Sequence, residues 1–338
     1  MTEQAPTLPA TEEKAAALPA PTDPAERRAL VIGEALIDVV RSGGQTLGRH
    51  PGGSPMNVAI GLARLGRAAD LLTWFGADED GAAITAHLAA SGVDVVPGSA
   101  SAERTSVATA TLDADGVATY DFDLSWQVPS TWASPPLPIV VHTGSIGAVV
   151  EPGGSDVAHI LEAHRPTATV TYDPNLRPSL MPPPADTRPV VERLVALSDV
   201  VKVSDEDLAW LEPGTEPTDV ARRWVGLGPA AVVVTRGGEG AVAVTRSGLT
   251  VEVATPRVTV ADTVGAGDSF MGGLIDGLWL AGLLGGERRA ALHDAGASTW
   301  QEVLERCTRI AAITVSRAGA NPPTRAELDD YRPGSAPS

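Results

Sequence analysis

The chain has 338 residues and a formal net charge of −17 at pH 7, which argues against a nucleic-acid surface because such a surface needs a basic footprint. Hydrophobic residues make up 43% and charged residues 20%, as is ordinary for a globular chain, and the length suits one large α/β domain or a domain with a small appendage. The single cysteine, Cys307, excludes an internal disulfide and a thiolate metal cluster, which fits a cytoplasmic protein.

The N-terminal 27 residues lack the apolar core of a secretory signal, and we expect a disordered tail there. No later stretch approaches the roughly 18 apolar residues of a membrane span, so we expect no membrane partner. RALVIGEALIDVV (28–40) is rich in β-branched residues and predicts one buried strand. PGGSPMNVAIGLARLG (51–66) then predicts a helix that begins near Pro55 and ends at Gly66.

The next segments continue as strand and helix. ADLLTWFG (69–76) predicts a strand and DEDGAAITAHLAASG (78–92) a helix, so the core sheet should be largely parallel. TSVATATLDADGVATYDFDL (105–124) breaks this alternation, because two β-rich runs surround Asp115-Gly116, a strong hairpin signal. Such an inserted hairpin predicts a lid beside the main sheet, and an ordinary edge hairpin is the alternative.

Alternating strands and helices resume after the hairpin and continue to the end of the domain. The predicted strands are PIVVHTG (138–144), ATVTYDPN (168–175), DVVKVS (199–204), AAVVVTRG (230–237) and the hairpin-like pair in 240–254. The predicted helices follow Glu151-Pro152, pass through 188–197, begin at Asp205, and occupy about 266–283 and 300–315.

A glycine-rich loop, DTVGAGDSF (262–270), precedes the first of the two long C-terminal helices. It is no dinucleotide fingerprint, because Phe270 stands where the third glycine belongs. It is no Walker loop either, because neither of the two lysines, Lys14 and Lys202, follows a glycine.

Three small residues, Gly265, Ala266 and Gly267, nevertheless place backbone N–H groups at a helix start, which predicts an anion site. Asp268 follows in the first turn of that helix. A carboxylate there is either the base that accepts a proton from an attacking hydroxyl or only a favourable N-terminal charge.

Other polar residues follow the predicted strands. In an open α/β sheet, ligands bind beyond the carboxyl ends of the strands, so these residues are the candidates for a site. They are Asp38, the 52–57 turn, Asp173 with Asn175 and Arg177, Lys202 with Ser204 and Asp207, and the segments 235–240 and 262–268.

Two long motifs in this order resemble the signatures of the PfkB, or ribokinase-like, carbohydrate kinases. They are PGGSPMNVAIGLARLG (51–66) and DTVGAGDSF (262–270), about 200 residues apart. The shorter segments GEALID (33–38), TYDPNLRP (171–178) and VVKVSDEDL (200–208) are similar to bacterial fructokinases.

The resemblance implies a fold and domain organisation. The fold is an α/β three-layer sandwich with a mostly parallel central sheet and a small β lid. The kinase domain would span 28–332, with the lid formed by about 104–124 plus about 38–50, and 333–338 would be a flexible C-terminus. The family often forms dimers through its lid, so a homodimer is expected.

The resemblance also implies catalytic and sugar-binding residues. Asp268 would be the general base, and the amides of Gly265, Ala266 and Gly267 would stabilise the transferred phosphoryl group. The implied sugar-binding residues are Asp38, Gly52, Gly53, Asn57, Arg104 and Arg177. For Asp38 a solvated strand end is the alternative, for Gly52 and Gly53 a simple turn, for Asn57 a polar first helical turn, and for Arg177 an ion pair with Asp173.

The nucleotide side implied by the resemblance comprises Asn175, Lys202, Ser204, Thr235, Gly237 and Gly240, with the helix near 307–311 closing the adenine pocket. A surface ion pair is the alternative for Lys202. Many family members carry Asn-x-x-Glu for Mg²⁺, whereas this chain has Ser204 and Asp207, and Glu206 is the alternative carboxylate. Asp262 and Val264, with 316–321 opposite, would hold K⁺.

The implied function is ATP-dependent phosphorylation of a sugar's primary hydroxyl, with D-fructose as the leading substrate. Another sugar, such as 2-keto-3-deoxygluconate or ribose, is the alternative within the same fold. A non-catalytic sugar-binding regulator is the alternative from a different class. Its expected sign, loss of the base or a filled anion site, is not seen at Asp268 and 265–267.

Overall fold

The computed structural model describes residues 27–113, 118–132 and 137–332. The predicted N-terminal tail, apart from its last residue, the Asp115-Gly116 turn and the predicted C-terminus at 333–338 lie outside the described residues. No helix in the described part is long and apolar enough to cross a membrane.

The main sheet has nine strands in the order β13-β12-β11-β10-β9-β8-β1-β4-β5. The seven strands from β11 to β5 are parallel, and β12 and β13 extend the sheet in antiparallel pairing. The prediction of a mostly parallel sheet is therefore confirmed. The strands are β1 (Arg28–Ile32), β4 (Ala68–Leu72), β5 (Val93–Val95), β8 (Val140–Gly144), β9 (Thr169–Asp173), β10 (Val200–Ser204), β11 (Ala231–Thr235), β12 (Ala241–Thr245) and β13 (Thr250–Val253).

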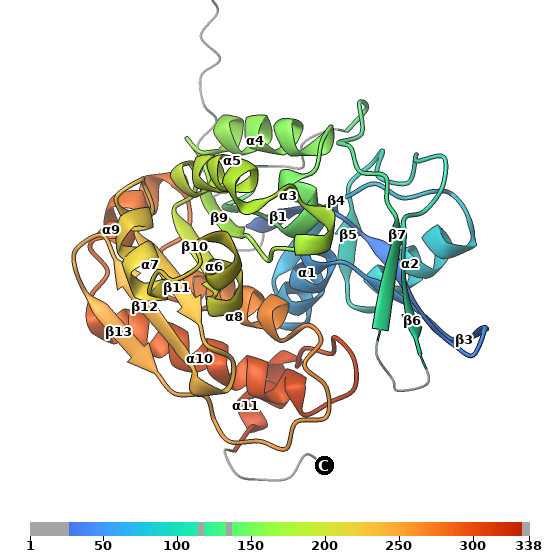
Figure 1. Cartoon of the computed structure of the whole chain (residues 1–338). Helices are drawn as coiled ribbons and strands as arrows, with labels where there is room; N and C mark the ends of the chain where they lie inside the picture. Colours follow the sequence, from blue (N-terminus) through green and yellow to red (C-terminus); the bar gives the residue numbers. More distant parts are fainter. Residues whose placement is uncertain (1–26, 114–117, 133–136, 333–338) are drawn as a thin grey trace, which may run out of the picture.

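Helices cover both faces of this sheet (Figure 1). One face carries α1 (Ser54–Arg64), α2 (Glu79–Ala90), α8 (Ala266–Leu280), α9 (Arg289–His293) and α10 (Ala297–Val315). The other carries α3 (Ser145–Val149), α4 (Gly153–His164), α5 (Pro184–Leu197), α6 (Asp205–Leu211) and α7 (Pro217–Val225). The remaining helices are α11 (Arg325–Asp330), which packs on α10, and the 3-10 turns η2 (Pro178–Leu180), η3 (Gly237–Glu239) and η4 (Gly286–Arg288).

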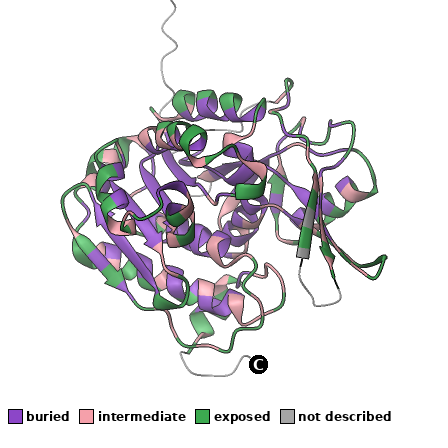
Figure 2. Ribbon diagram, viewed as in Figure 1, coloured by how far each residue is buried: buried purple, intermediate pink, exposed green. Residues whose placement is uncertain are grey.

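The inner strands of the main sheet are buried on both faces and mostly apolar, whereas the edge strand β13 alternates between exposed and buried residues. In β1, Ala29 and Val31 enter the core beneath α1 and α8, whereas Leu30 and Ile32 enter the core on the α4 side. Parallel strands covered on both faces are expected to be continuously hydrophobic. Figure 2 shows the resulting buried sheet between helices whose outer faces are exposed. The expected three-layer sandwich is confirmed.

A second, four-stranded sheet lies beside the main body and forms the right-hand part of Figure 1. Its order is β3-β2-β6-β7, with β2 (Leu36–Ser42), β3 (Gln45–Gly52), β6 (Val107–Leu112) and β7 (Ala118–Asp123). We call it the lid sheet. β6 and β7 form the predicted hairpin. It lies in this small sheet beside the main sheet, as predicted, and not at an edge of the main sheet.

The prediction of one strand over 28–40 is wrong. The chain leaves the main sheet after β1 and enters the lid sheet at β2, with the break at Gly33. Gly33 has a φ of +150°, and a Cβ there would lie 2.3 Å from Cγ of Pro55. The turn therefore brings the root of the lid sheet against the start of α1, where a larger residue would not fit.

Candidate active site

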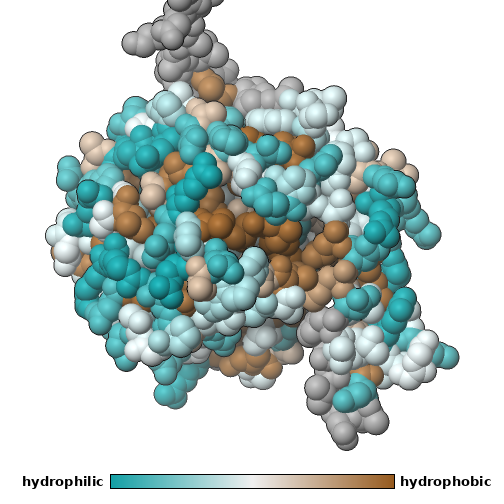
Figure 3. Space-filling view, turned by 45° about the horizontal axis from the view of Figure 1, so that its top comes forward, coloured by the Kyte–Doolittle hydropathy of each residue, from teal (hydrophilic) through white to brown (hydrophobic). Residues whose placement is uncertain are grey.

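A cavity of about 1110 Å³ opens at the carboxyl ends of the parallel strands, between the main body and the lid sheet. The lid contributes Leu36, Asp38, Ala108 and Phe122 to its wall. The first turns of α1 and α8, the ends of β10 and β11, and one face of α10 form the rest. Figure 3 shows one side of the molecule, where hydrophilic residues lie along most of the outline and apolar residues gather toward the middle.

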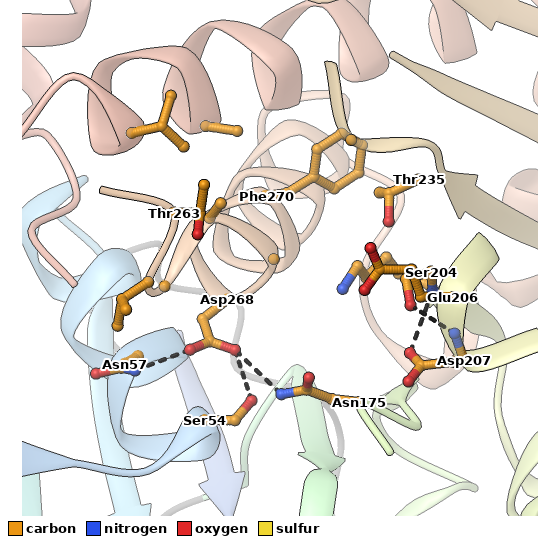
Figure 4. A pocket seen from close by; sticks show the side chains of 18 of the residues that line it. Ser54, Asn57, Asn175, Ser204, Glu206, Asp207, Thr235, Thr263, Asp268 and Phe270 are labelled. Carbon is orange, nitrogen blue, oxygen red and sulfur yellow. Dashed lines mark hydrogen bonds between the residues drawn. The ribbon is translucent and has the colours of Figure 1, made fainter. Parts of the chain in front are cut away.

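Asp268 lies in this cavity in the first turn of α8 and is only 8% exposed. Its Oδ1 accepts a 2.6 Å hydrogen bond from Ser54 Oγ and a longer, 3.4 Å bond from Asn175 Nδ2. Its Oδ2 accepts a 2.8 Å bond from Asn57 Nδ2 (Figure 4). The residue that caps α8 is Gly265, so Asp268 is more than an N-terminal charge: side chains from two other segments hold its carboxylate.

The glycines before Asp268 allow close backbone approach. Gly265 has a φ of +74°, and a Cβ there would lie 2.6 Å from the Cβ of Ala320. A Cβ at Gly267 would lie 3.0 Å from Lys202 Nζ. The amide of Ala266 donates a long, 3.3 Å bond to the Thr263 carbonyl, so an anion at this helix start would compete with that bond.

Lys202 is buried beside this helix start. It is 3% exposed, and its Nζ donates to Asp173 Oδ2 at 2.9 Å. The surface ion pair considered for Lys202 is therefore wrong, and so is the ion pair between Arg177 and Asp173. Burial raises the pKa of Asp173 to about 6, against the opposing charge of Lys202. Burial also disfavours the Lys202 ammonium, but Asp173, Asp207 and Asp268 together raise its pKa.

Arg177 holds the loop after β9. Its guanidinium donates to the Asn175 carbonyl at 3.0 Å, to Asn175 Oδ1 at 2.8 Å and to the Leu176 carbonyl at 3.0 Å. Asn175 has a φ of +37°, so these bonds stabilise an uncommon backbone conformation. Arg177 also borders the cavity, where its charge acts on the carboxylates of Glu34 and Asp38.

Asp38 borders the lid side of the cavity, and the neighbouring glycine makes room for it. A Cβ at Gly52 would lie 2.0 Å from Asp38 Oδ2, and one at Gly53 would lie 2.5 Å from the Glu34 carbonyl. The Asp38 side chain is reached by solvent, yet desolvation by the surrounding wall raises its pKa, while Arg177 and His50 oppose that shift.

Two further polar residues belong to the site. Ser54 lies in the 52–57 turn that the sequence predicts to border the site, but no role was predicted for it, and Glu34 was not predicted at all. Ser54 lies inside the N-terminal signature, and its hydroxyl bonds to Asp268. Glu34 is 6% exposed, borders the cavity and accepts a 2.8 Å bond from the Gly147 amide. Burial raises its pKa to about 7, although its own amide and that of Gly147 oppose the shift. Its position in GEALID was the available signal, but that segment was interpreted as a strand interior.

Arg104 does not reach the cavity. Its side chain is 65% exposed and pairs with Asp123 of the lid sheet at 2.5 Å. The described residues that form the cavity wall do not include it. In this arrangement the side chain is directed along the lid toward β7, so the sugar contact at Arg104 stays a prediction.

The acidic residues at the start of α6 have different surroundings. Ser204 caps the helix in a capping box with Asp207, and Asp207 Oδ1 also accepts from the Leu176 amide at 2.9 Å. Asp207 thereby joins α6 to the loop after β9. Glu206 borders the cavity next to Asp207 (Figure 4). Among the described residues, no group of three or more His, Cys, Asp or Glu could hold a metal ion by itself.

The other predicted nucleotide residues, Thr235, Gly237 and Gly240, border the cavity at the end of β11. Thr308 and Ala311 of α10, the helix predicted to close the adenine pocket, border it too. Cys307 is fully buried behind that surface, and burial raises its pKa, so it packs as a small hydrophobic residue.

The loop expected to hold a monovalent cation lies beside 316–321. Asp262 Oδ1 accepts from the Val264 amide at 3.0 Å, and Oδ2 accepts from the Gly319 amide at 2.8 Å. These backbone donors lower the pKa of Asp262. The two segments are therefore adjacent, although the Val264 side chain is 55% exposed.

Comparison with known proteins relates this cavity to a family. The sequence profile of a family described as "pfkB family carbohydrate kinase" matches residues 26–327. The chain is 33% identical to a fructokinase of Rhizobium leguminosarum bv. trifolii over 276 residues, or 78% of this chain and 84% of that protein. It is 34% identical to a fructokinase of Klebsiella pneumoniae over 261 residues, or 75% and 85%.

A solved structure is similar over nearly the whole chain. It is a double mutant of the fructokinase of Vibrio cholerae O395, with fructose, ADP and a potassium ion bound. The two chains are 26% identical with a TM-score of 0.71, and the alignment covers 90% of this chain and 97% of the other.

Proposed function

Because the chain belongs to the pfkB family of carbohydrate kinases, we propose that it transfers the γ-phosphoryl group of ATP to the primary hydroxyl of D-fructose. The family membership makes it a sugar kinase. The choice of fructose is supported by the two fructokinases at 33% and 34% identity and by the fructose bound in the Vibrio cholerae relative.

The observation that carries the proposal is the Asp268 carboxylate held by Ser54, Asn57 and Asn175 inside the cavity. As general base, Asp268 accepts the proton of the sugar's primary hydroxyl while the oxygen of that hydroxyl attacks the γ-phosphorus of ATP. The bond from phosphorus to the bridging oxygen of ADP breaks at the same time. Positioning and electrostatics supply most of the catalysis in phosphoryl transfer.

The charge that develops on the phosphoryl group lies next to the start of α8. The amides of Gly265 to Gly267 and the helix dipole stabilise it there. Lys202, whose Nζ lies near Gly267, adds a positive charge beside the start of α8. In this structure, that charge is paired with Asp173. Thr235, Gly237, Gly240 and α10 line the remaining length of the cavity, which fits the nucleotide.

The sugar side of the cavity fits a neutral substrate. Glu34 and Asp38 face it, and Arg177, whose charge acts on both carboxylates, already supports the loop after β9. An acid sugar such as 2-keto-3-deoxygluconate needs a free cation for its carboxylate. Arg104, the other cation considered for that task, pairs with Asp123 outside the cavity.

Two cations belong to the proposal. Mg²⁺ takes few protein ligands and shares the phosphate oxygens of its nucleotide, which fits a cavity whose wall includes Glu206 and Asp207 at the start of α6. K⁺ is assigned to Asp262 and Val264 with 316–321, since these segments adjoin the anion site and the Vibrio cholerae relative binds potassium.

The test measures ADP release with fructose, tagatose, ribose, nucleosides and 2-keto-3-deoxygluconate, with and without K⁺. We expect fructose to give the highest kcat/KM. A panel in which fructose gives no turnover while another sugar does would refute the substrate assignment and leave the sugar kinase intact.

The first prediction concerns the base. Asp268→Asn keeps the shape of the side chain but cannot accept the proton, so kcat should fall by about 10²–10⁴ with a small change in KM. Ser54→Ala removes one donor and keeps the carboxylate, so its loss should be smaller. Wild-type turnover by Asp268→Asn would contradict the proposed mechanism.

A further inference from the structure

A buried carboxylate in the middle of α8, Asp276, binds three arginines. Asp276 is fully buried. Its Oδ1 accepts from Arg67 Nε at 2.7 Å and from Arg325 at 2.8 Å, and its Oδ2 accepts from Arg306 Nε at 2.6 Å. These arginines follow α1, begin α11 and lie on α10, respectively. We call these four residues the Asp276 cluster.

The cluster also fixes the C-terminal end of α1. Arg325 donates to the Leu65 carbonyl at 2.5 and 3.1 Å, and Leu65 is the C-cap residue of α1. Arg67, two residues further on, joins the same helix end to Asp276 and stacks 5.0 Å over the Trp279 ring of α8. α1 and α8 are therefore tied to each other at this end by charge.

The same two helices meet again at the cavity. Ser54 and Asn57 in the first turn of α1 donate to Asp268 in the first turn of α8. Asp268 and Asp276 lie eight residues apart on α8, which is about 12 Å along the axis. Between them the helices touch closely, since a Cβ at Gly272 would lie 3.7 Å from the Val58 carbonyl of α1.

A helix transmits a shift at one end to the other, because its backbone bonds make it stiff on this length scale. We propose that Asp276 is a positioning residue that sets the placement of α1 against α8 and thereby the hydrogen bonds of Asp268. Without its charge, three guanidinium groups would face one another at close range with no counter-charge among them. Their repulsion would separate the end of α1, α10 and α11 from α8.

The kinetic test of this inference rests on the proposed sugar kinase activity, because it measures kcat. The variant is Asp276→Asn, which keeps the side-chain shape and removes the charge. The matched control is Asp199→Asn, which removes another buried carboxylate that binds an arginine, Arg289, at 2.5 Å. Asp199 directly precedes β10, at the amino end of that strand, whereas the cavity lies at the carboxyl ends of the strands.

Both variants should lower the Tm. At a temperature where circular dichroism shows both to be folded, Asp276→Asn should lower kcat by about ten- to hundredfold, because small misplacements of a reacting group are costly. KM should change little, Asp199→Asn should keep kcat within about twofold of wild type, and Asp276→Glu should recover part of the loss. An equal loss in both variants, or wild-type kcat in folded Asp276→Asn, overturns the proposal.

A second readout does not depend on turnover. Amide hydrogen exchange in the first turns of α1 and α8 should become faster in Asp276→Asn and stay unchanged in Asp199→Asn. If the wild-type protein phosphorylates none of the sugars, this exchange still decides the inference, whereas the proposed function fails. If Asp276→Asn does not fold, Arg325→Gln takes its place, because it removes the bonds that tie the Leu65 carbonyl at the end of α1 to Asp276. Exchange in the first turns of α1 and α8 should then become faster than in wild type, and unchanged exchange would overturn the proposal.

Discussion

Gly267 is a single position at which side-chain size bears on the chemistry. A methyl group there would lie 3.0 Å from Lys202 Nζ, and Lys202 is held by Asp173. The same methyl group would project toward the place proposed for the phosphoryl group. Small size is needed here for close approach, since the φ of Gly267 is not in the left-handed region.

Gly267→Ala should therefore lower kcat by about 10–10², through loss of part of the anion site. The control is Gly296→Ala, at the start of α10, where a Cβ meets nothing within 4 Å. Steady-state kinetics and thermal unfolding of both variants make the comparison. Equal kcat in the two variants would count against the anion site.

Glu34 gives the protein a pH dependence that can be measured on folding. Its pKa rises from 4.5 to about 7 in the folded protein because the carboxylate is buried. Between these values the folded protein holds a proton that the unfolded chain has released. Stability from this group is therefore lost as the pH rises toward 7, by up to about 1.4 kcal/mol per pH unit.

Glu34→Gln removes this titration. We expect the unfolding free energy of wild type to fall relative to that of Glu34→Gln as the pH is raised from about 5 to about 8. Denaturant unfolding at several pH values measures the difference. Glu162→Gln, which replaces a carboxylate that is 46% exposed, serves as the control variant. A difference that is constant with pH would contradict the assignment.

Elements differ in how far the sequence predicts them. β8 to β13, α8 and α10 were predictable because long apolar runs and glycine boundaries mark them. β5, α3 and α9 have three to five residues each, too few to show a periodicity. α7 was missed although its buried Val220 and Trp224 have helical spacing, because charged residues surround them.

The residues of the candidate site that lie within a sequence motif were predictable. The contacts between segments far apart in the sequence were not. Asp268 and its glycines follow from the loop sequence. The bond from Ser54, 214 residues away, depends on the packing of α1 against α8. The pairing of Lys202 with Asp173 depends on the register between β9 and β10. The pairing of Arg104 with Asp123 depends on the lid sheet.

The start of α6 separates two acidic residues that sequence reasoning left as alternatives. Asp207 accepts from the backbone amides of Leu176 and Ser204, so it supports the loop after β9. Asp207→Ala should thus lower the stability by about 1–2 kcal/mol, as loss of a cap does. Glu206→Gln should keep the Tm and raise the Mg²⁺ concentration needed for half-maximal rate. Thermal unfolding and Mg²⁺ titrations distinguish these roles, and an unchanged Mg²⁺ dependence in Glu206→Gln would contradict its assignment.

At the scale of the whole molecule, the lid sheet presents an edge. β3 is an edge strand, and its Leu47 is 63% exposed. Exposed edge strands tend to pair with another chain, which supports the proposed homodimer through the lid. We expect light scattering to give twice the mass of the 34.7 kDa chain, and Leu47→Asp to give the single mass. A monomeric wild type at micromolar concentration would refute it.

Lysine is scarce in this protein, with Lys14 and Lys202 as its two lysines. Lys202 is the lysine of the described region, and it is 3% exposed beneath the anion site. Amine-reactive reagents should therefore leave Lys202 unmodified in the folded protein. The rate at which Lys202 is modified, measured by mass spectrometry, should therefore report how often this part of the cavity wall opens to solvent.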